Sequence, residues 1–308
     1  MSSTPEQLLS LVPESLQQTV ANYWQDWSAA CEKAELSPQA ELSVMGKIWA
    51  CSEFVARQCI RRPGMVDELV TEGLETGRSA EDYQQLVVQA IAAAEPTDEG
   101  LMRALRLLRQ KEMVRIAWRD LAGLAEVEPV LHELSDFAEA VIVQTLDHLY
   151  QQTTEVLGIP TSTEGEAQQM MVLAMGKLGG RELNFSSDID LIFAYAEQGN
   201  TEGGRHLSNH EFFVRLAGKL VRLLDEITQD GFVFRVDTRL RPNGDSGPLA
   251  MNFNAMEQYY QLQGRDWERY AMIKARILGG KEADRKYLAS MLRPFTYRRY
   301  LDFGAFES

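Results

Sequence analysis

The sequence of 308 residues has few cysteines and fewer basic residues than acidic ones. Its cysteines, Cys31, Cys51 and Cys59, are odd in number, lack CxxC spacing and have no histidines nearby. Neither a disulfide framework nor a zinc site is supported, and the three are expected to be reduced thiols in the core. The 45 acidic residues outnumber the 31 basic ones, for a formal net charge of −14. This balance disfavours a nucleic-acid binder, which depends on phosphate contacts.

Targeting and membrane segments are also lacking. The first residues have neither the basic nor the apolar region of a signal peptide, and no run reaches the roughly 18 apolar residues of a membrane span. We therefore expect a cytoplasmic protein with no membrane partner. A Walker A loop is absent too, because no Gly-Lys pair is followed by Ser or Thr.

The acidic excess is confined to the first half of the chain. Residues 1–160 carry 25 acidic and 12 basic residues, whereas residues 161–308 carry 20 and 19. The nearly neutral, arginine-rich second half is the better place to look for a site that binds an anion.

Helical periodicity runs from about residue 14 to residue 151, interrupted by loop signals such as Ser37-Pro38 and Pro63-Gly64. The stretch 101–125 has apolar residues at near-helical intervals and basic residues on its other faces. We expect these basic residues to form a solvated face of a bundle helix. They are Arg103, Arg106, Lys111, Arg115 and Arg119.

Strand signals begin after a boundary expected near residues 158–162. The apolar run 170–175 predicts a strand that is buried on both faces. Residues 188–195 are rich in β-formers and predict a second strand, with its acids at the start. The fold class expected is α+β, with a mixed sheet between helical segments.

A helix, a strand and a further helical segment are predicted next. Ser208 and Glu211 form a capping box, and Gly231 is expected to end the helix that they begin. Alternation over 232–241 predicts a strand that Pro242 stops. The apolar stripe of the helix consists of Phe213, Leu216, Leu220, Leu224 and Ile227. From 253 to 278 the pattern is helical again, and one face carries Arg265, Arg269 and Arg276 as a solvated stripe or a contact surface.

Two aspartates at the start of the second strand carry the chemical signal. Side chains alternate along a strand, so Asp188 and Asp190 project from one face, about 6–7 Å apart. They are either an acidic strand end open to water or ligands of two divalent metals, which neutralise such neighbouring carboxylates. Gly176, Gly179 and Gly180 precede them in a loop where backbone amides can approach a phosphate.

A third acid lies on the predicted strand 232–241. Asp237 shares a face with Arg235, Arg239 and Arg241 in that pattern. An acid flanked by arginines is either part of a salt-bridged surface ladder or a third metal ligand beside a phosphate site, because guanidinium binds phosphate in a bidentate manner.

The glycine loop, Asp-x-Asp on a strand and a later Asp together resemble the nucleotidyltransferase superfamily that includes DNA polymerase β. The longer segments are more specific. AMGKLGGRELNFSSDIDLIF, RVDTRLRPNGDSGPL and GRDWERYAMIKARILGG are similar to bacterial glutamine synthetase adenylyltransferase/adenylyl-removing enzymes. That family has two such catalytic domains in one chain, of which the N-terminal one removes AMP and the C-terminal one adds it.

The resemblance implies a set of site residues and ligands. Asp188, Asp190 and Asp237 would be catalytic ligands of two Mg²⁺ or Mn²⁺ ions. The implied residues that line the phosphates are Gly176, Lys177, Gly179, Gly180 and Ser187. By their position, rather than by the resemblance, Arg239 and Arg241 are expected to hold the incoming phosphate or the β-phosphate of the product. The implied partners are glutamine synthetase as the protein substrate, phosphate, ADP or ATP, and the PII signal protein as regulator.

The residues of these motifs and the long helical segment before them resemble the N-terminal, adenylyl-removing part of the family. The expected domains are a helical one at 1–158, a catalytic core at 159–252 and a helical segment at 253–308 that the family continues further. The expected reaction is phosphorolysis of the tyrosine-AMP bond, which yields ADP. Adenylyl transfer from ATP to a protein tyrosine and a non-catalytic, partner-binding module stay open as alternatives.

Overall fold

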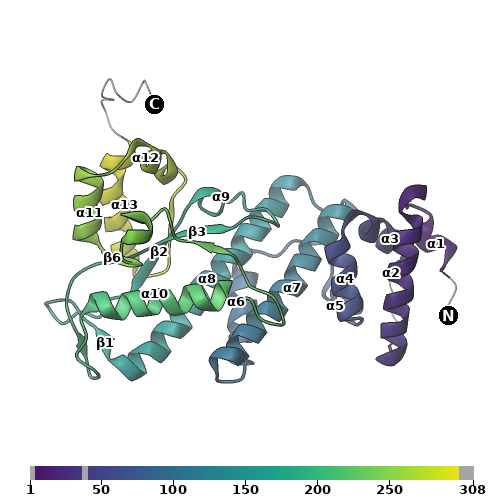
Figure 1. Ribbon diagram of the computed structural model, residues 1–308, viewed down its shortest axis with the longest axis horizontal. Coiled ribbons are helices and arrows are strands. Elements are labelled where there is room, and N and C mark those ends of the chain that lie inside the picture. The colour runs from purple at the N-terminus through teal and green to yellow at the C-terminus, as the bar shows by residue number, and fades with distance from the viewer. Residues whose placement is uncertain (1–3, 37–40, 298–308) are drawn as a thin grey trace. The chain divides into compact units, whose positions relative to one another are not determined.

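The computed structural model describes residues 4–36 and 41–297 (Figure 1). The chain divides into two compact units, Met1–Ser79 with Leu107–Leu134 and Ala80–Arg106 with Ser135–Ser308. The loop expected at Ser37-Pro38 and the end of the expected 253–308 segment lie outside the described residues. The domain boundaries at residues 158 and 252 stay predictions. No described helix is long and apolar enough to cross a membrane.

The first unit is helical, as the periodicity predicts. Its core contains Trp27 and Trp49, whose rings meet edge to face with centroids 5.7 Å apart. Ser52 begins a new helix by accepting a hydrogen bond from the N–H of Val55. The helices are α1 (Glu6–Leu9), α2 (Glu14–Lys33), α3 (Leu42–Cys51), α4 (Glu53–Arg61) and α5 (Met65–Glu72), with parts of α7 (Asp98–Ala122) and α8 (Val127–Leu157).

The cysteines are free thiols, but they do not all lie in the core. Cys31 and Cys59 are buried, and burial raises the pKa of the Cys59 thiol to about 12. Cys51 is exposed, so its predicted burial is wrong. The reason is its position on α3, where Ile48 and Trp49 take the core-facing positions.

The predicted solvated basic face of residues 101–125 is wrong for three of its arginines. Arg106, Arg115 and Arg119 are 0, 2 and 4% exposed. Arg115 and Arg119 both bind the buried carboxylate of Glu133, the latter at 2.9 Å. Charged side chains are rarely buried unless they are paired. Glu133, the partner of Arg115 and Arg119, lies on another helix, and the periodicity of one helix does not reveal such a partner.

These arginines also bind backbone carbonyls. Arg115 donates to the carbonyl of Thr76 at 2.6 Å, and Arg119 donates to that of Leu74 at 2.9 Å. Arg106, in the second unit, donates to the carbonyls of Gly231 and Glu226. The buried arginines of α7 therefore hold loops in place rather than face solvent.

The second unit contains a mixed sheet. In the described residues its strand order is β5-β3-β2-β7, and β6 pairs with the far end of β3. Strand β2 is antiparallel to both of its neighbours, whereas β5 and β6 run parallel to β3. The strands are β2 (Met170–Ala174), β3 (Ile189–Tyr195), β5 (Val236–Asp237), β6 (Ala250–Asn252) and β7 (Arg276–Leu278), and β1 (Ile159–Pro160) pairs separately with β4 (Thr201–Glu202).

Helices cover both faces of this sheet, which confirms the α+β class (Figure 1). Met171 and Leu173 of β2 pack against Met256 and Leu292 on one face. On the other face Tyr195 of β3 stacks on Phe213. The helices of the unit are α6 (Ala80–Ala92), α9 (Gly176–Gly179), α10 (Asn209–Asp225), α11 (Phe253–Leu262), α12 (Asp266–Met272) and α13 (Glu282–Thr296), with parts of α7 and α8; a 3-10 turn, η1, spans Gly244–Ser246.

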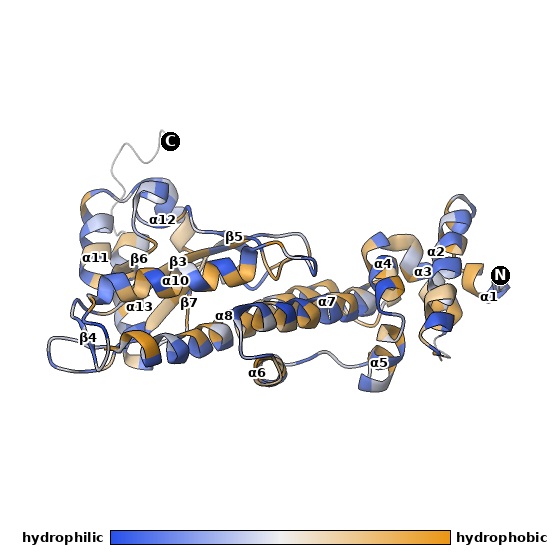
Figure 2. Ribbon diagram, turned by 60° about the horizontal axis from the view of Figure 1, so that its bottom comes forward, coloured by the Kyte–Doolittle hydropathy of each residue, from blue (hydrophilic) through white to orange (hydrophobic). Residues whose placement is uncertain are grey.

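Helix α10 confirms the capping box but ends early. The hydroxyl of Ser208 accepts the N–H of Glu211, and the Glu211 carboxylate accepts that of Ser208. Hydrophilic and hydrophobic residues recur along α10 in Figure 2. Ile227, predicted to extend the apolar stripe, lies beyond the last helical residue Asp225 and is 79% exposed.

The strand predicted over 232–241 is reduced to two residues. The N–H groups of Val233 and Phe234 both donate to the carbonyl of Leu224, so this part of the segment bonds to the end of α10 rather than to a strand. After Asp237 the chain turns, because the N–H of Arg239 donates to the Asp237 carboxylate at 2.8 Å. The predicted alternation of faces therefore fails on both sides of β5.

The continuous helix predicted over 253–278 is also wrong. It is broken at Gly264, where a Cβ would lie 2.5 Å from the ring of Phe295 and 2.6 Å from the carbonyl oxygen of Tyr260. Arg276 belongs to strand β7, because this short segment completes the edge of the sheet beside β2. Helical periodicity cannot distinguish these cases over such short stretches.

Candidate active site

The sheet brings two of the three predicted acids side by side. Parallel pairing of β3 with β5 places Asp190 directly opposite Asp237, and Asp188 lies two residues before Asp190, just ahead of β3. Burial raises the pKa of Asp190, and the negative charges of Asp237 and Asp188 raise it further. The structure therefore disfavours ionisation of Asp190.

Each of the other two acids has an arginine partner. Arg235 binds Asp188 at 2.5 Å, and Arg239 donates from Nε to both oxygens of Asp237 at 2.9 and 3.0 Å. The Arg239 hydrogen bonds hold the pKa of Asp237 below its usual range. No hydrogen bond or ion pair to the Asp190 side chain is found in the described part of the chain.

The metal predicted at these acids can be tested against the geometry. Among residues 4–36 and 41–297, no three acids, histidines or cysteines are gathered closely enough to hold a metal ion. Asp190 and Asp237 nevertheless fit a shared divalent cation, because adjacent, mutually repelling carboxylates favour one. Asp188 could join them only by leaving Arg235, and both members of that pair are about half exposed, so the exchange costs little.

A one-turn helix, α9, stands where a glycine loop was predicted. Gly176 begins it with φ +55°, and a Cβ there would lie 2.9 Å from Oδ2 of Asp190. Glycine therefore lets the backbone approach the carboxylate. The ammonium of Lys177 donates to the hydroxyl of Ser187 at 3.3 Å, and that hydroxyl donates to Asn184 at 2.8 Å. The structure thus brings Gly176, Lys177 and Ser187 to the acids' end of β3.

Gly179 packs against backbone and is buried. A Cβ at this position would lie 2.1 Å from the carbonyl oxygen of Lys274 and 2.4 Å from that of Ala174. Arg276 donates to the Gly179 carbonyl at 3.2 Å and pairs with Glu139. Packing explains this glycine in the structure, whereas the neighbouring Gly180 is exposed.

We expect Gly179→Ala to destabilise the second unit by about 3 kcal/mol, because the added methyl must displace two carbonyl groups. Gly218→Ala is the matched control. Gly218 lies within α10, and nothing is found within 4 Å of the position that an added Cβ would take, so alanine should stabilise by about 0.5–1 kcal/mol. Urea unfolding of both variants measures the difference, and equal midpoints would contradict the packing role.

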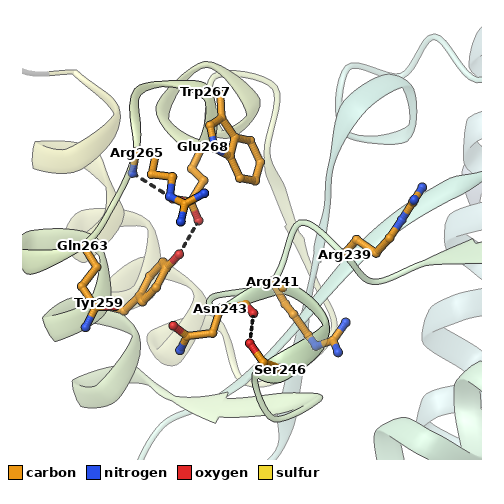
Figure 3. A pocket seen from close by; sticks show the side chains of 10 residues that line it. Arg239, Arg241, Asn243, Ser246, Tyr259, Gln263, Arg265, Trp267 and Glu268 are labelled. Carbon is orange, nitrogen blue, oxygen red and sulfur yellow. Dashed lines mark hydrogen bonds between the residues drawn. The ribbon is translucent and has the colours of Figure 1, made fainter. Parts of the chain in front are cut away.

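A pocket of about 290 Å³ is lined in part by Arg239, the partner of Asp237 (Figure 3). Three arginines line it, including the predicted Arg239 and Arg241. Arg241 is held by its bonds to the carbonyl and hydroxyl of Thr238, at 2.8 and 2.9 Å. Arg265 has no carboxylate partner for its guanidinium among the described residues. In Figure 3 the guanidinium groups of Arg239 and Arg241 point away from Arg265, so they lie on the opposite side of the pocket. Guanidinium groups suit an anionic ligand. The full lining is Arg239, Arg241, Asn243, Gly244, Ser246, Tyr259, Gln263, Arg265, Trp267 and Glu268.

Most of the α11–α12 side of this pocket was not predicted. Of the three arginines expected on one helical face, only Arg265 lines the pocket. Arg269 is buried and pairs with Asp266 at 2.9 Å, and Arg276 contacts α9. The missed residues are Tyr259, Gln263, Trp267 and Glu268. Trp267 and Glu268 lie within the segment GRDWERYAMIKARILGG, so its resemblance to the family was the signal available for them, whereas Tyr259 and Gln263 precede it.

Comparison with known proteins agrees with the sequence motifs. Residues 42–290 match the family model described as glutamate-ammonia ligase adenylyltransferase. The chain is 47% identical, over its whole length, to the bifunctional glutamine synthetase adenylyltransferase/adenylyl-removing enzyme of Thioalkalivibrio sulfidiphilus, and covers 32% of that protein. Over 87% of the chain it is 54% identical to the protein of the same name from Nitrosococcus oceani, of which it covers 28%.

A third relative shows the same relation. The chain is 50% identical, over 89% of its length, to the bifunctional enzyme of the same name from Pseudomonas syringae pv. tomato, and covers 28% of it. The chain thus spans about a third of the length of these relatives. Because the matched region contains the acids, the glycine turn and the pocket, the chain belongs to the glutamate-ammonia ligase adenylyltransferase family.

Proposed function

We propose that this chain removes AMP from adenylylated glutamine synthetase by phosphorolysis. An oxygen of inorganic phosphate attacks the phosphorus of the AMP group, the bond from that phosphorus to the tyrosine oxygen breaks, and the tyrosine oxygen takes up a proton. The products are ADP and the unmodified tyrosine. The observation that carries the proposal is the pairing of Asp190 with Asp237 beside an arginine-lined pocket.

The three acids would hold the metal ions of this reaction. Asp190 and Asp237 lie opposite each other on paired strands, and Asp188 can bind a metal ion once its ion pair with Arg235 is broken. Two bound Mg²⁺ or Mn²⁺ ions would supply charge stabilisation for the attacking and leaving oxygens. The raised pKa of Asp190 supports this assignment, because the carboxylate stands in a negative environment that a cation relieves.

The arginines would bind the phosphate groups. Arg239 and Arg241 line the pocket on the side of Asp237, and Arg265 reaches it from the start of α12. Arg239 is 74% exposed and forms a bidentate pair with Asp237, which is 18% exposed, so Arg239 would bind phosphate by exchanging its bond to this carboxylate. Arg239 then links the acids to the pocket. Lys177 and Ser187 lie on the α9 side of the acids and would contact the remaining phosphate oxygens.

Glutamine synthetase as the protein substrate is supported by the names of the relatives. Regulation by the PII signal protein and a cytoplasmic location are further parts of the proposal. The removing direction is supported by the resemblance of ELNFSSDID and RVDTRLRP to the N-terminal part of the family. The relatives' names also include adenylyl transfer. It is the second candidate function, because the same acids and arginines would bind the metal ions and phosphates of that reaction.

The test incubates the chain with adenylylated or unmodified glutamine synthetase, Mg²⁺, and either phosphate or ATP, and follows the bound AMP by mass. We expect loss of AMP with formation of ADP only when phosphate is present. Gain of AMP from ATP would establish the transferase instead. AMP release that does not depend on phosphate would mean that water is the nucleophile, and no change under any condition would contradict both activities.

We expect Arg239→Ala to raise the phosphate concentration for half-maximal rate about tenfold, because it removes one guanidinium from the pocket. Arg222→Ala is the matched control. Arg222 is also exposed and also pairs with an aspartate, Asp98, but it does not line the pocket. Initial rates against phosphate concentration distinguish the two variants, and an unchanged phosphate dependence in Arg239→Ala would remove this residue from the phosphate site.

A further inference from the structure

The arginine pocket also has an aromatic wall. Tyr259 and Trp267 both line it, and Trp267 is 47% exposed. Trp24, Trp27 and Trp49 of the first unit pack against one another, whereas Trp267 has no aromatic neighbour among the described residues. An exposed indole on a pocket wall offers a free face to a planar ligand.

This wall is held in place by hydrogen bonds to one buried carboxylate. Glu268 is 3% exposed and accepts the Tyr259 hydroxyl at 2.9 Å and the backbone N–H of Arg265 at 2.8 Å (Figure 3). Burial raises the pKa of Tyr259, so its hydroxyl stays protonated and can donate. The start of α12, which carries Trp267, is thereby joined to α11 in a preformed pocket.

Two side-chain amides complete the lining. Asn243 and Gln263 line the pocket, and within the described chain neither side-chain amide has a hydrogen-bond partner. Asn243 has φ 64° in the turn that follows Pro242. Each amide offers both donors and an acceptor, which is the pattern that pairs with the edge of a purine.

We propose that this pocket is the nucleobase subsite of the adenine nucleotide, with Trp267 as the residue on which the adenine ring stacks. Asn243 and Gln263 pair with the edge of the base, and the phosphates extend toward Arg239 and Arg241. This inference rests on the proposed function, which places the phosphates there. It adds the position of the base and the residues that select it.

The occupant is the purine rather than the tyrosyl ring of the protein substrate. Both are planar and both are attached to the reacting phosphate, so both could stack on Trp267. A tyrosyl ring that is esterified through its oxygen has no group to pair with Asn243 and Gln263, whereas adenine has ring nitrogens and an amino group. The free amides therefore favour the base.

The experiment measures binding of ADP, pyrophosphate and O-phosphotyrosine by calorimetry in the presence of Mg²⁺. We expect Trp267→Ala to weaken ADP binding about 10- to 100-fold, the range of base stacking on an aromatic side chain, and to leave pyrophosphate binding unchanged. Trp267→Phe should restore most of the ADP affinity, because it keeps an aromatic face. Tyr270→Ala is the matched control, since Tyr270 is an exposed aromatic residue of the same helix that does not line the pocket.

The outcomes separate the two proposals. ADP binding that is weakened by Arg239→Ala but unchanged in Trp267→Ala would overturn the base subsite and leave the proposed phosphate site intact. Equal loss of O-phosphotyrosine and ADP in Trp267→Ala would place the tyrosyl ring there instead and overturn the assignment. ADP binding that neither Arg239→Ala nor Trp267→Ala weakens would overturn the phosphate site together with the base subsite.

Discussion

Asp190→Asn should lower the rate of AMP removal by at least about 10³-fold. The substitution keeps the shape of the side chain but removes the charge that a divalent cation needs, at the acid that faces both Gly176 and Asp237. Asp98→Asn is the matched control, because it takes a carboxylate from an exposed ion pair with Arg222. Single-turnover rates at saturating Mg²⁺ measure the effect. Mg²⁺-dependent activity in Asp190→Asn equal to that of the control would contradict the metal assignment.

The same variant should fold and be slightly more stable without metal. Burial and like charges raise the pKa of Asp190 above its unfolded value of 3.8, so the native state binds a proton more tightly than the unfolded state. Ionisation therefore costs stability as pH rises through the native pKa, and asparagine removes this cost. We expect a gain in stability at pH 7 that vanishes below the unfolded pKa, measured by urea unfolding.

Glu133→Ala should destabilise the first unit by about 3–5 kcal/mol. The carboxylate is 4% exposed and binds Arg115 and Arg119, which are also buried, and it accepts the backbone N–H of Arg78 at 3.0 Å. Its removal leaves two buried guanidinium groups without their carboxylate, which is the costly way to break a buried ion pair.

Glu53→Ala is the matched control for this prediction. Glu53 pairs with Arg57 at 2.6 Å, but both side chains are more than 60% exposed, so its removal should change stability by less than about 1 kcal/mol. Urea unfolding of the two variants, followed by tryptophan fluorescence, provides the comparison, because Trp27 and Trp49 lie in the core of the first unit. A loss in Glu133→Ala no larger than that in Glu53→Ala would show that the arginines find water or other partners.

Part of the site could be predicted because its signals are local. Asp188 and Asp190 are two residues apart at the start of a β-rich run, and β3 indeed begins at Ile189. The side of the pocket that Arg239 and Arg241 form could not be predicted. The reason is that Arg239 lies in a turn, which its backbone N–H forms by donating to the Asp237 carboxylate, rather than on a strand. Side-chain-to-backbone bonds of this kind compete with strand pairing and leave the alternation of residue types unchanged.

Local sequence is enough to predict strands β2 and β3, the capped start of α10 and the motifs of the family, because each depends on residues close together in the chain. Tertiary contacts set three other features: the position of Asp190 opposite Asp237, the burial of the α7 arginines and the pocket that Arg239 shares with Trp267. Strand register and the pairing of buried charges are set by partners far away in sequence. Local periodicity describes which face a residue takes on its own element, but not what that face meets.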